Sequence, residues 1–248
     1  MSKIKKHQSD WENLGKIDPL WAVLSDNSKR FNNWNLEEFL ETGDKEGSYI
    51  WEKIEELDLS IKTERILDFG CGVGRLARFW LKHFDSYTGC DISPSMIEKA
   101  KEINSFKAQF IISGEDLSML NSNHFDFIYS GIVLQHMPNK KAIYKYLLEF
   151  NRILKPNGLL VFQLPSKIPW QFKLQPIRKL YKLLKFIGFS DNFLYNKLRL
   201  YPIKMTAILD KNLKTFLENN NFEVKEIEAD TYCGPRVESK TYYCQKIN

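Results

Sequence analysis

The sequence has little of what marks secreted, metal-stapled or membrane-spanning chains. Its 248 residues include only four cysteines, and no two of them form a C-x-x-C pair, so neither a disulfide scaffold nor a zinc knuckle is expected. The first ten residues are polar and lack the apolar core of a signal peptide. No uncharged apolar run approaches the roughly 18 residues that a membrane span needs. We therefore expect a soluble, cytoplasmic protein with reduced thiols.

Arginine is also scarce, and the excess of positive charge is small. The chain has 36 Lys and Arg against 31 Asp and Glu, a formal net charge of +5. That excess is well below the charge of a dedicated nucleic-acid binder. Hydrophobic residues make up 43% of the chain, which is close to the globular average, so a sizeable core can form without covalent staples.

The middle of the chain alternates short apolar runs with helical patterns. The predicted strands are 65–69, 87–90, 110–112, 125–130 and 159–164, and the predicted helices are 75–84, 140–154 and one that opens at Ser93-Pro94. Ser93 suits an N-cap and Pro94 suits the first helical position. Strands that alternate with helices indicate βαβ units in a parallel sheet. A helix at 210–220 and strands at 222–229 and 241–247 follow, and these two strands should pair antiparallel.

A glycine-rich loop after the first of these strands is the strongest functional signal. It reads Leu67-Asp68-Phe69-Gly70-Cys71-Gly72-Val73-Gly74-Arg75. Glycines at such a junction let the backbone turn tightly and approach a ligand closely, beyond the carboxyl ends of the strands. A dinucleotide site requires G-x-G-x-x-G, but here Arg75 stands where the third glycine of that fingerprint belongs.

Two carboxylates near the loop separate the cofactor classes. Asp68 would repel a pyrophosphate, but it would attract a cationic amino-acid ligand. Asp91 stands at the tip of the second strand, where it can accept hydrogen bonds from a ribose diol. One acid for an ammonium group and one for a ribose fit S-adenosylmethionine.

These segments resemble the class I S-adenosylmethionine-dependent methyltransferases of the bacterial small-molecule type. The loop resembles their motif I, and the resemblance continues through 89–97, 125–130 and 154–160, with Asn157 at a usual glycine position. It implies an α/β fold: a doubly wound, seven-stranded, mostly parallel Rossmann-like sheet with an antiparallel last strand. It also implies S-adenosylmethionine as cofactor, S-adenosylhomocysteine as product, and no metal.

The resemblance implies a set of cofactor contacts as well. Asp68 and the loop glycines would line the methionine end, Asp91 would hold the ribose, and Asp116 would receive the exocyclic amine of adenine. The full expected set is Asp68, Gly70, Cys71, Gly72, Gly74, Arg75, Asp91, Ile92, Met96, Glu115, Asp116, Leu117, Ser130 and Gly131. Arg75 either contacts the cofactor carboxylate or only packs, and Cys71 is expected to fill space rather than to act as a nucleophile.

His136 and Gln163 are the candidates for catalysis. His136 follows the fourth strand on the side where the methyl group should lie, and the ordinary histidine pKa of roughly 6.5 suits a general base. The alternative is a structural histidine packed beneath the pocket. Gln163 either orients the substrate or satisfies the backbone. Expected substrate contacts are Trp21, Gln135 and Arg236, the last as an anion clamp.

Two segments added to the 61–248 core should select the acceptor. Residues 1–60 are rich in tryptophan and form either a helical lid or a helical cap over the core. The insertion at 166–204 holds nine Lys and Arg and one Asp, and 178–185 is a basic amphipathic helix. This insertion is interpreted as a solvated face on a substrate lid, with a pocket for a phosphate-bearing substrate and a peripheral membrane contact as alternatives.

The expected function is therefore methyl transfer to a small molecule. The acceptor is predicted to be a hydroxyl of a sugar or surface-glycan precursor, as in capsule or polysaccharide biosynthesis, with a nucleotide- or phosphate-linked form included. The alternatives are N-methylation of an amino sugar or amine, RNA methylation, and a non-catalytic cofactor-binding subunit. Beyond the acceptor we expect no nucleic-acid partner and no stable membrane association, and the chain is predicted to be a monomer or a homodimer.

Overall fold

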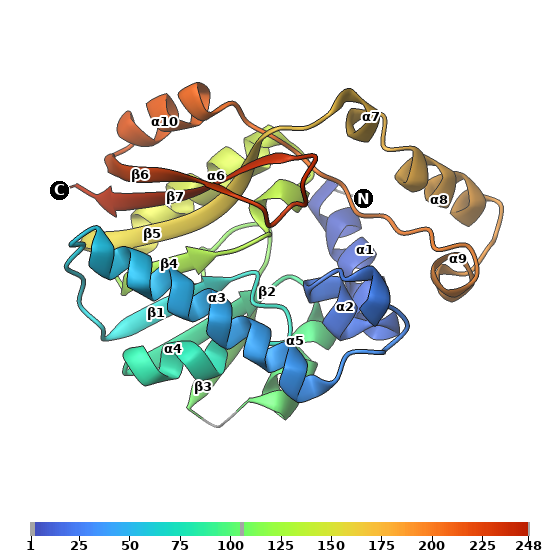
Figure 1. Ribbon diagram of the computed structural model, residues 1–248, viewed down its shortest axis with the longest axis horizontal. Helices are drawn as coiled ribbons and strands as arrows, with labels where there is room; N and C mark the ends of the chain where they lie inside the picture. The colour runs from blue at the N-terminus through green and yellow to red at the C-terminus, as the bar shows by residue number, and fades with distance from the viewer. Residues whose placement is uncertain (1–2, 105–106, 248) are drawn as a thin grey trace.

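The protein, described by a computed structural model over residues 3–104 and 107–247, is built around one seven-stranded sheet (Figure 1). Its strands are Arg65–Phe69 (β1), Ser86–Asp91 (β2), Ala108–Ile112 (β3), Phe125–Ser130 (β4), Leu154–Lys167 (β5), Phe222–Asp230 (β6) and Glu238–Lys246 (β7). Their order in the sheet is β3-β2-β1-β4-β5-β7-β6. Strands β1 to β5 pair parallel, whereas β7 runs antiparallel to both β5 and β6. The predicted doubly wound sheet with an antiparallel last strand is confirmed.

Helices cover both faces of this sheet. In the described chain they are Lys3–Ile17 (α1), Pro19–Val23 (α2), Leu36–Glu56 (α3), Ala77–His83 (α4), Pro94–Ile103 (α5), Lys140–Ile153 (α6), Trp170–Lys173 (α7), Pro176–Phe186 (α8), Asp191–Asn196 (α9) and Asp210–Glu218 (α10), with short 3₁₀ turns at Asn27–Lys29 (η1) and Leu134–His136 (η2). Helices α3, α4 and α5 lie on one face, and α6 and α10 lie on the other (Figure 1).

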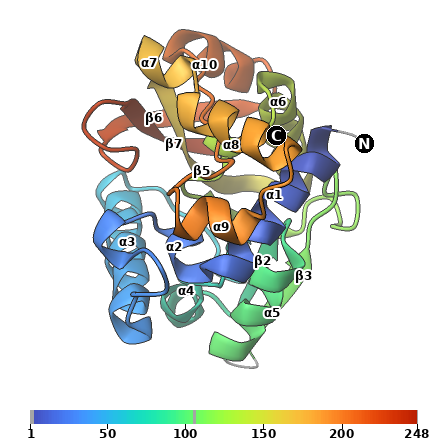
Figure 2. The same cartoon turned by 90° about the vertical axis from the view of Figure 1, so that its right-hand side faces the viewer.

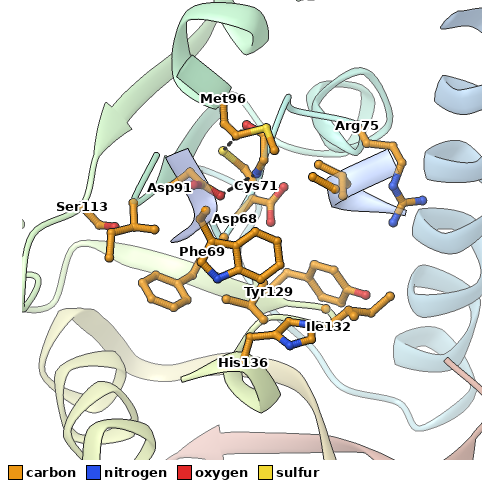
Figure 3. Close-up of a pocket in the computed structure, with 18 of the residues that line it drawn as sticks. Asp68, Phe69, Cys71, Arg75, Asp91, Met96, Ser113, Tyr129, Ile132 and His136 are labelled. Atoms are coloured by element: carbon orange, nitrogen blue, oxygen red, sulfur yellow. Dashed lines mark hydrogen bonds between the residues drawn. The ribbon is translucent and has the colours of Figure 1, made fainter. Parts of the chain in front are cut away.

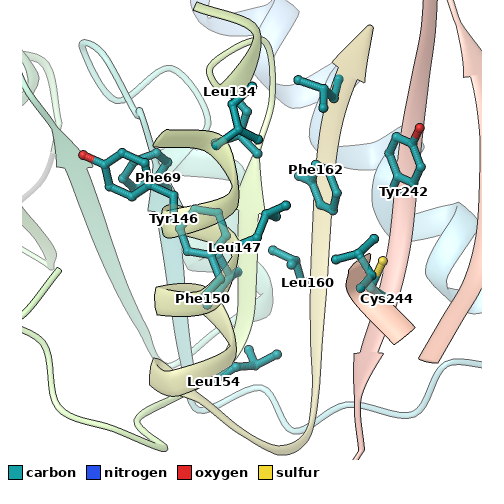
Figure 4. Packing of buried hydrophobic residues seen from close by; sticks show 14 of the residues in the cluster. Phe69, Leu134, Tyr146, Leu147, Phe150, Leu154, Leu160, Phe162, Tyr242 and Cys244 are labelled. Carbon is teal, nitrogen blue, oxygen red and sulfur yellow. The ribbon is translucent and has the colours of Figure 1, made fainter. Parts of the chain in front are cut away.

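Two hydrophobic layers hold these helices to the sheet. On the α6 side, the rings of Tyr146 and Phe150 pack on Phe69 of β1, with centroids 4.8 and 5.0 Å apart, and Leu147 lies beside Leu160 of β5 (Figure 4). The central strand β4 is buried along its whole length, as expected for a parallel strand that is covered on both faces. Burying one such aromatic or aliphatic side chain contributes about 1.5–3 kcal/mol. These layers therefore hold the carboxyl ends of the strands in fixed positions.

Several element boundaries differ from the prediction by one to five residues, and the differences at α4 and β5 have clear physical reasons. Helix α4 begins at Ala77 rather than at Arg75, because the three loop glycines have positive φ and the chain is still turning through 76. Strand β5 extends beyond the predicted 159–164 to Lys167, because its last residues pair with β7. Asn157 has φ +62° in the turn of β5, which explains why it replaces the usual glycine there.

The first 60 residues occupy two different places. Helices α1 and α2 lie across the carboxyl ends of the parallel strands, and Figure 2 shows them from that end. Helix α3 runs along a face of the sheet, where Ile50 and Ile54 join the same hydrophobic layer as Trp80 of α4. Asn35 caps α3, since its side-chain oxygen accepts a hydrogen bond from the Glu38 N–H at 3.1 Å.

The segment between β5 and α10 is helical and packs against α1 and α2 (Figure 2). The side-chain amide of Asn13 in α1 donates to Asp191 Oδ2 at 2.8 Å. The Tyr195 hydroxyl of α9 donates to Asp18 Oδ2, just before α2, at 2.7 Å. Within residues 3–104 and 107–247, every helix is too short or too polar to cross a bilayer.

Candidate active site

A cavity lies at the carboxyl ends of β1, β2 and β4, below α1 and α2 (Figure 3). Its volume is about 910 Å³ when the open solvent at its mouth is included, and it lies outside the carboxyl ends of the strands, where ligands of doubly wound sheets bind. The predicted site residues in its wall are Asp68, Gly70, Cys71, Gly72, Arg75, Asp91, Ile92, Met96, Gly131 and His136. The structure thus brings most of the expected cofactor residues and the candidate base to one cavity.

The glycine-rich loop forms one side of this cavity and leaves no room for side chains. Gly70 and Gly72 have φ of +80° and +54°, a region that residues with a Cβ rarely occupy. A Cβ at Gly72 would lie 2.3 Å from a methyl carbon of Val23 in α2. The backbone N–H groups of Gly70 and Cys71 both donate to the carbonyl of Cys90, which ties the loop to β2.

Asp91 is held against the cavity by backbone donors. Its Oδ2 accepts from the Gly72 N–H at 3.0 Å, and its Oδ1 accepts from the Ser93 N–H at 2.9 Å. Burial raises the pKa of Asp91, although these hydrogen bonds oppose the shift. Because both bonds come from rigid backbone, the position of the carboxylate is fixed before any ligand arrives.

Asp68 lies deeper, at the end of β1, and is almost fully buried. It accepts a hydrogen bond from the Tyr87 hydroxyl at 2.7 Å. Burial raises the pKa of Asp68 to about 7, with the Tyr87 hydrogen bond opposing the shift and the nearby Glu46 adding to it. In the described chain no ion pair reaches this carboxyl group. A cation placed in the cavity would therefore favour its ionised form.

Arg75 is held by a residue that the sequence did not point to. Its Nη2 pairs with Glu46 Oε2 of α3 at 2.6 Å, and both side chains are buried. The Tyr129 hydroxyl donates to the other oxygen of Glu46 at 2.7 Å. The guanidinium also donates to Thr42 Oγ1 at 3.2 Å. Arg75, Glu46 and Tyr129 all line the cavity, so they form a connected polar wall opposite the glycine loop.

In the sequence, a pair of glycines inside the helix indicates the close contact between α3 and Arg75. Gly43 and Gly47 lie one turn apart in α3. A Cβ at Gly43 would lie 2.3 Å from the backbone oxygen of Arg75, and one at Gly47 would lie 2.3 Å from the Phe79 ring. Glycines inside a helix are costly, so two of them on one face indicate a close approach of another backbone.

His136 closes the cavity on the side away from Asp91 and Met96 (Figure 3). Its Nδ1 lies 2.7 Å from the carbonyl oxygen of Lys204, and since a carbonyl only accepts, Nδ1 carries the proton. Nε2 then carries the lone pair and accepts a hydrogen bond from the side-chain N–H of Gln135 at 3.1 Å. Burial lowers the pKa of His136 to about 4, although the Lys204 hydrogen bond opposes the shift. The ring is therefore neutral near pH 7 and can accept a proton at Nε2.

Helix α1 is fastened over the cavity by Glu12. Its Oε2 accepts from the Ser95 N–H at 3.0 Å and from the Ser93 hydroxyl at 2.7 Å. Burial acts to raise the pKa of Glu12, but the hydrogen bonds from Ser95, Lys16 and Ser93 outweigh it and lower the pKa to about 2. This attachment sets His7 and Trp11 into the cavity wall, two residues that were not predicted for the site.

Other predicted site residues lie outside this wall. Gln163 is buried in the interior, and its side-chain amide donates to Ser239 Oγ and to Cys233 Sγ. Gln135 accepts from the Cys233 thiol at 2.7 Å and reaches the cavity only through His136. Trp21 is 2% exposed in the packing of α1 and α2. These residues lie behind the residues that line the cavity rather than among them.

The expected adenine segment also lies apart from the cavity. Asp116 accepts hydrogen bonds from Ser118 and Lys145, so its carboxylate is already engaged. Ser113, directly after β3, lines the cavity in its place. Arg236 is exposed in the loop before β7. The remaining predicted residues outside the wall are Gly74, Glu115, Leu117 and Ser130.

Residues with metal-binding side chains do not gather in this region. Throughout residues 3–104 and 107–247, no three His, Cys, Asp or Glu residues are grouped so that they could hold a metal ion. The four cysteines all carry free thiols.

Comparisons with known proteins match this part of the chain. Residues 67–162 match the family described as "Methyltransferase domain". The 2-methyl-6-phytyl-1,4-hydroquinone methyltransferase of Synechocystis sp. is 33% identical over 99 residues, which cover 39% of this chain and 30% of that relative. The malonyl-[acyl-carrier protein] O-methyltransferase of Buchnera aphidicola is 30% identical over 152 residues, which cover 61% of this chain and 58% of that relative. The chain thus spans less than two thirds of either relative.

The fold itself has close counterparts among solved structures. Magnesium protoporphyrin IX methyltransferase from Synechocystis PCC 6803, solved with bound S-adenosylhomocysteine, superposes with a TM-score of 0.63 at 16% identity. The superposition covers 99% of this chain and 100% of that one. At this low identity the likeness shows a shared fold, the Rossmann-like sheet with its flanking helices.

Proposed function

We propose that this chain, which contains a class I methyltransferase domain, transfers a methyl group from S-adenosylmethionine to a hydroxyl of a small molecule. The observation that carries the proposal is the cavity at the strand ends, where the glycine loop, Asp68, Asp91 and His136 meet. Ligands of doubly wound sheets bind at this edge. The family match over 67–162 supports the same activity.

The residues of the cavity fit the cofactor. Asp91, fixed by two backbone donors, offers its remaining lone pairs to a ribose diol. Asp68, buried without an ion pair from the described chain, suits the ammonium group of the methionine end. Ile92 and Met96 supply an apolar surface for the adenine. When bound, S-adenosylmethionine supplies a methyl group on a cationic sulfur, and transfer forms an oxygen–carbon bond, breaks the carbon–sulfur bond and leaves S-adenosylhomocysteine.

In this proposal His136 takes the proton of the acceptor hydroxyl at Nε2. The Lys204 carbonyl holds the proton on Nδ1, which leaves the lone pair on Nε2, and the acceptor hydroxyl displaces the Gln135 amide from this lone pair when it binds. Gln135 and, behind it, Cys233 and Gln163 orient the imidazole rather than contact the acceptor. Most of the remaining acceleration would come from aligning the acceptor oxygen with the methyl group and from excluding water.

The lid in this proposal is α1 together with α2. His7 and Trp11 of α1 and Ala22 and Val23 of α2 line the cavity, so a ligand enters or leaves only if these helices move or leave a gap. Helix α3 is part of the core instead, because it packs on the sheet and supplies Glu46. The acceptor class, a sugar or surface-glycan hydroxyl, stays a prediction, and an amine acceptor would use the same cavity.

Calorimetric titration with S-adenosylhomocysteine, with NAD as the comparison ligand, tests the proposed cofactor. We expect micromolar binding of S-adenosylhomocysteine and no binding of NAD, since Arg75 stands where a dinucleotide site needs glycine. Binding of NAD alone would overturn the proposal. An acceptor panel of sugars, nucleotide sugars and amines with labelled S-adenosylmethionine then tests transfer, and product analysis separates O- from N-methylation.

A further inference from the structure

A second cavity adjoins the first and shares part of its wall. His7, Trp11 and His136 line both cavities. The second one lies between α1, α8 and the extended segment at 202–204, and its volume is about 800 Å³ with the open solvent at its mouth included. A ligand in it would therefore meet His136 from the side opposite the glycine loop.

The second cavity is strongly cationic. Lys6, Arg178, Lys182 and Lys204 line it, and Asp10 is the one carboxylate among its described lining residues. In the described chain, Lys6 and Lys182 form no hydrogen bond or ion pair with another residue. Four cations around one cavity with a single acid repel one another, so the arrangement costs stability unless an anion joins it.

Two hydrogen bonds hold the guanidinium group of Arg178 in a fixed orientation at the second cavity. Its Nε donates to the carbonyl of Pro202 at 3.0 Å, and its Nη1 donates to the side chain of Gln175 at 3.1 Å. These two bonds hold the guanidinium plane at the cavity wall while Nη2 stays available to a ligand. A positioned guanidinium is well suited to phosphate oxygens.

The groups that line the second cavity lie close enough to affect one another's ionisation. Burial lowers the pKa of Lys182, and the charges of Arg178 and Lys6 lower it further. Burial also lowers the pKa of His7 to about 4, with His136, Arg178 and Lys204 adding to the shift. His7 and His136 are therefore neutral near pH 7 and add no charge of either sign to the cavity.

The orientation of α8 shows where its charge is directed. Helices usually bury their apolar face and expose their charges. In α8 Ile177, Leu180 and Leu183 are exposed beside Lys179 and Lys185, and Tyr181 and Leu184 pack inward. Arg178 and Lys182, one turn apart, line the cavity, so two of the four cations of this helix face it while apolar side chains remain exposed.

We propose that the second cavity binds the phosphate group of a phosphate-bearing acceptor and presents the acceptor's hydroxyl to His136. This inference rests on the proposed function for the hydroxyl, but the anion site itself does not require activity. Lys6, Arg178, Lys182 and Lys204 contact the phosphate, and the shared wall of Trp11 and His136 lets the rest of the molecule extend toward the glycine loop.

The test measures binding of inorganic pyrophosphate to the full chain by calorimetry, with and without saturating S-adenosylhomocysteine. Lys182→Gln removes one cation from the cavity, and Lys179→Gln is its control, because Lys179 is exposed on the same helix and does not line the cavity. We expect Lys182→Gln to weaken pyrophosphate binding at least tenfold, and Lys179→Gln to change it less than twofold. Lys179→Gln should keep the thermal midpoint of the unchanged chain, Lys182→Gln should not lower it, and both variants should keep the affinity for S-adenosylhomocysteine.

Other outcomes separate the two proposals. If pyrophosphate binds equally to both variants, or does not bind at all, the anion site is wrong even when S-adenosylhomocysteine binds. If acetate or citrate competes as well as phosphate and pyrophosphate do, the assignment to phosphate is overturned. If pyrophosphate binds as expected but S-adenosylhomocysteine does not, the anion site stands and the proposed function fails. Loss of pyrophosphate binding in Arg178→Gln, which keeps a polar side chain, would support the site independently.

Discussion

The two cavities that meet at His136 are opposite in charge and in construction. The first is lined by Asp68, Asp91 and the Glu46–Arg75 pair, so it offers carboxylates to a cationic ligand. The second is lined by four cations and one carboxylate. Opposite charge on either side of one histidine keeps two ligands apart and orients each of them. In the two proposals taken together, opposite charges hold a cationic donor and an anionic acceptor on either side of His136.

The largest effect is expected from removing the imidazole of His136, which lines both cavities. His136→Ala should reduce turnover by about 10²–10⁴-fold, because the acceptor hydroxyl loses its proton acceptor. The affinity for S-adenosylhomocysteine should stay within about twofold, since the cofactor contacts come from other residues. Steady-state kinetics and calorimetry measure the two quantities.

His124→Ala is the matched control for that variant. His124 lies just before β4, at the amino end of the strand, and packs on Phe125. It should leave turnover unchanged. A His136→Ala protein that folds normally and turns over at the original rate would show that the imidazole is structural.

A smaller effect is expected from the acidic cavity. Asp91→Ala should weaken S-adenosylhomocysteine binding by about 1–3 kcal/mol, the cost of losing a charged hydrogen bond to the ribose. Asp85→Ala is the control, because Asp85 is an exposed carboxylate at the opposite end of β2. Calorimetry on both variants measures the affinity for S-adenosylhomocysteine. If Asp91→Ala binds it as tightly as the unchanged chain does, Asp91 does not hold the ribose.

The smallest effect concerns the stability of the free protein. The pKa of Asp68 is raised from 3.8 to about 7, so the folded protein holds this proton more tightly than the unfolded chain does. The stability gained in this way is fully present below about pH 4 and is lost as the pH rises through 7. Asn cannot ionise, so Asp68→Asn should be more stable than the unchanged chain at pH 8 by about 1–2 kcal/mol, and less so at pH 5.

Urea unfolding at pH 5 and pH 8 measures this difference. Asp85→Asn serves as the control and should shift stability equally at both pH values. An Asp68→Asn effect that does not depend on pH would mean that the carboxyl of Asp68 ionises normally in the fold. The same variant should also bind S-adenosylhomocysteine more weakly, because a neutral amide attracts the ammonium group less.

The first cavity could be predicted from the sequence because its residues are local to strand ends. A run such as 65–69 followed by glycines defines both a buried strand and the loop after it, and Asp91 follows its own strand in the same way. The parallel order of the strands then brings these ends together. Glu46 could not be found by this reasoning, because its contact with Arg75 depends on how α3 packs along the sheet.

The second cavity could not be predicted from the sequence either, because it too depends on how distant elements pack. It joins Lys6 of α1, Lys182 of α8 and Lys204 of an extended segment, and no periodicity in the sequence relates three such distant positions. The basic insertion at 166–204 was recognised, and a phosphate pocket was one of its alternatives, but a charged amphipathic helix is ordinarily expected to show its charges to solvent. The orientation of α8 depends on tertiary contacts, such as those of Tyr181 with Asp191 and of Arg178 with the carbonyl of Pro202.

The placement of the second cavity affects what a comparison with relatives can say about the acceptor. Of its described lining residues, only His136 and Pro138 fall within the 67–162 region that matches the methyltransferase family. The proposed acceptor site is thus built mostly from segments outside the region that matches the family, whereas most residues of the proposed donor site lie inside that region. Similarity over 67–162 therefore bears on the donor more than on the acceptor.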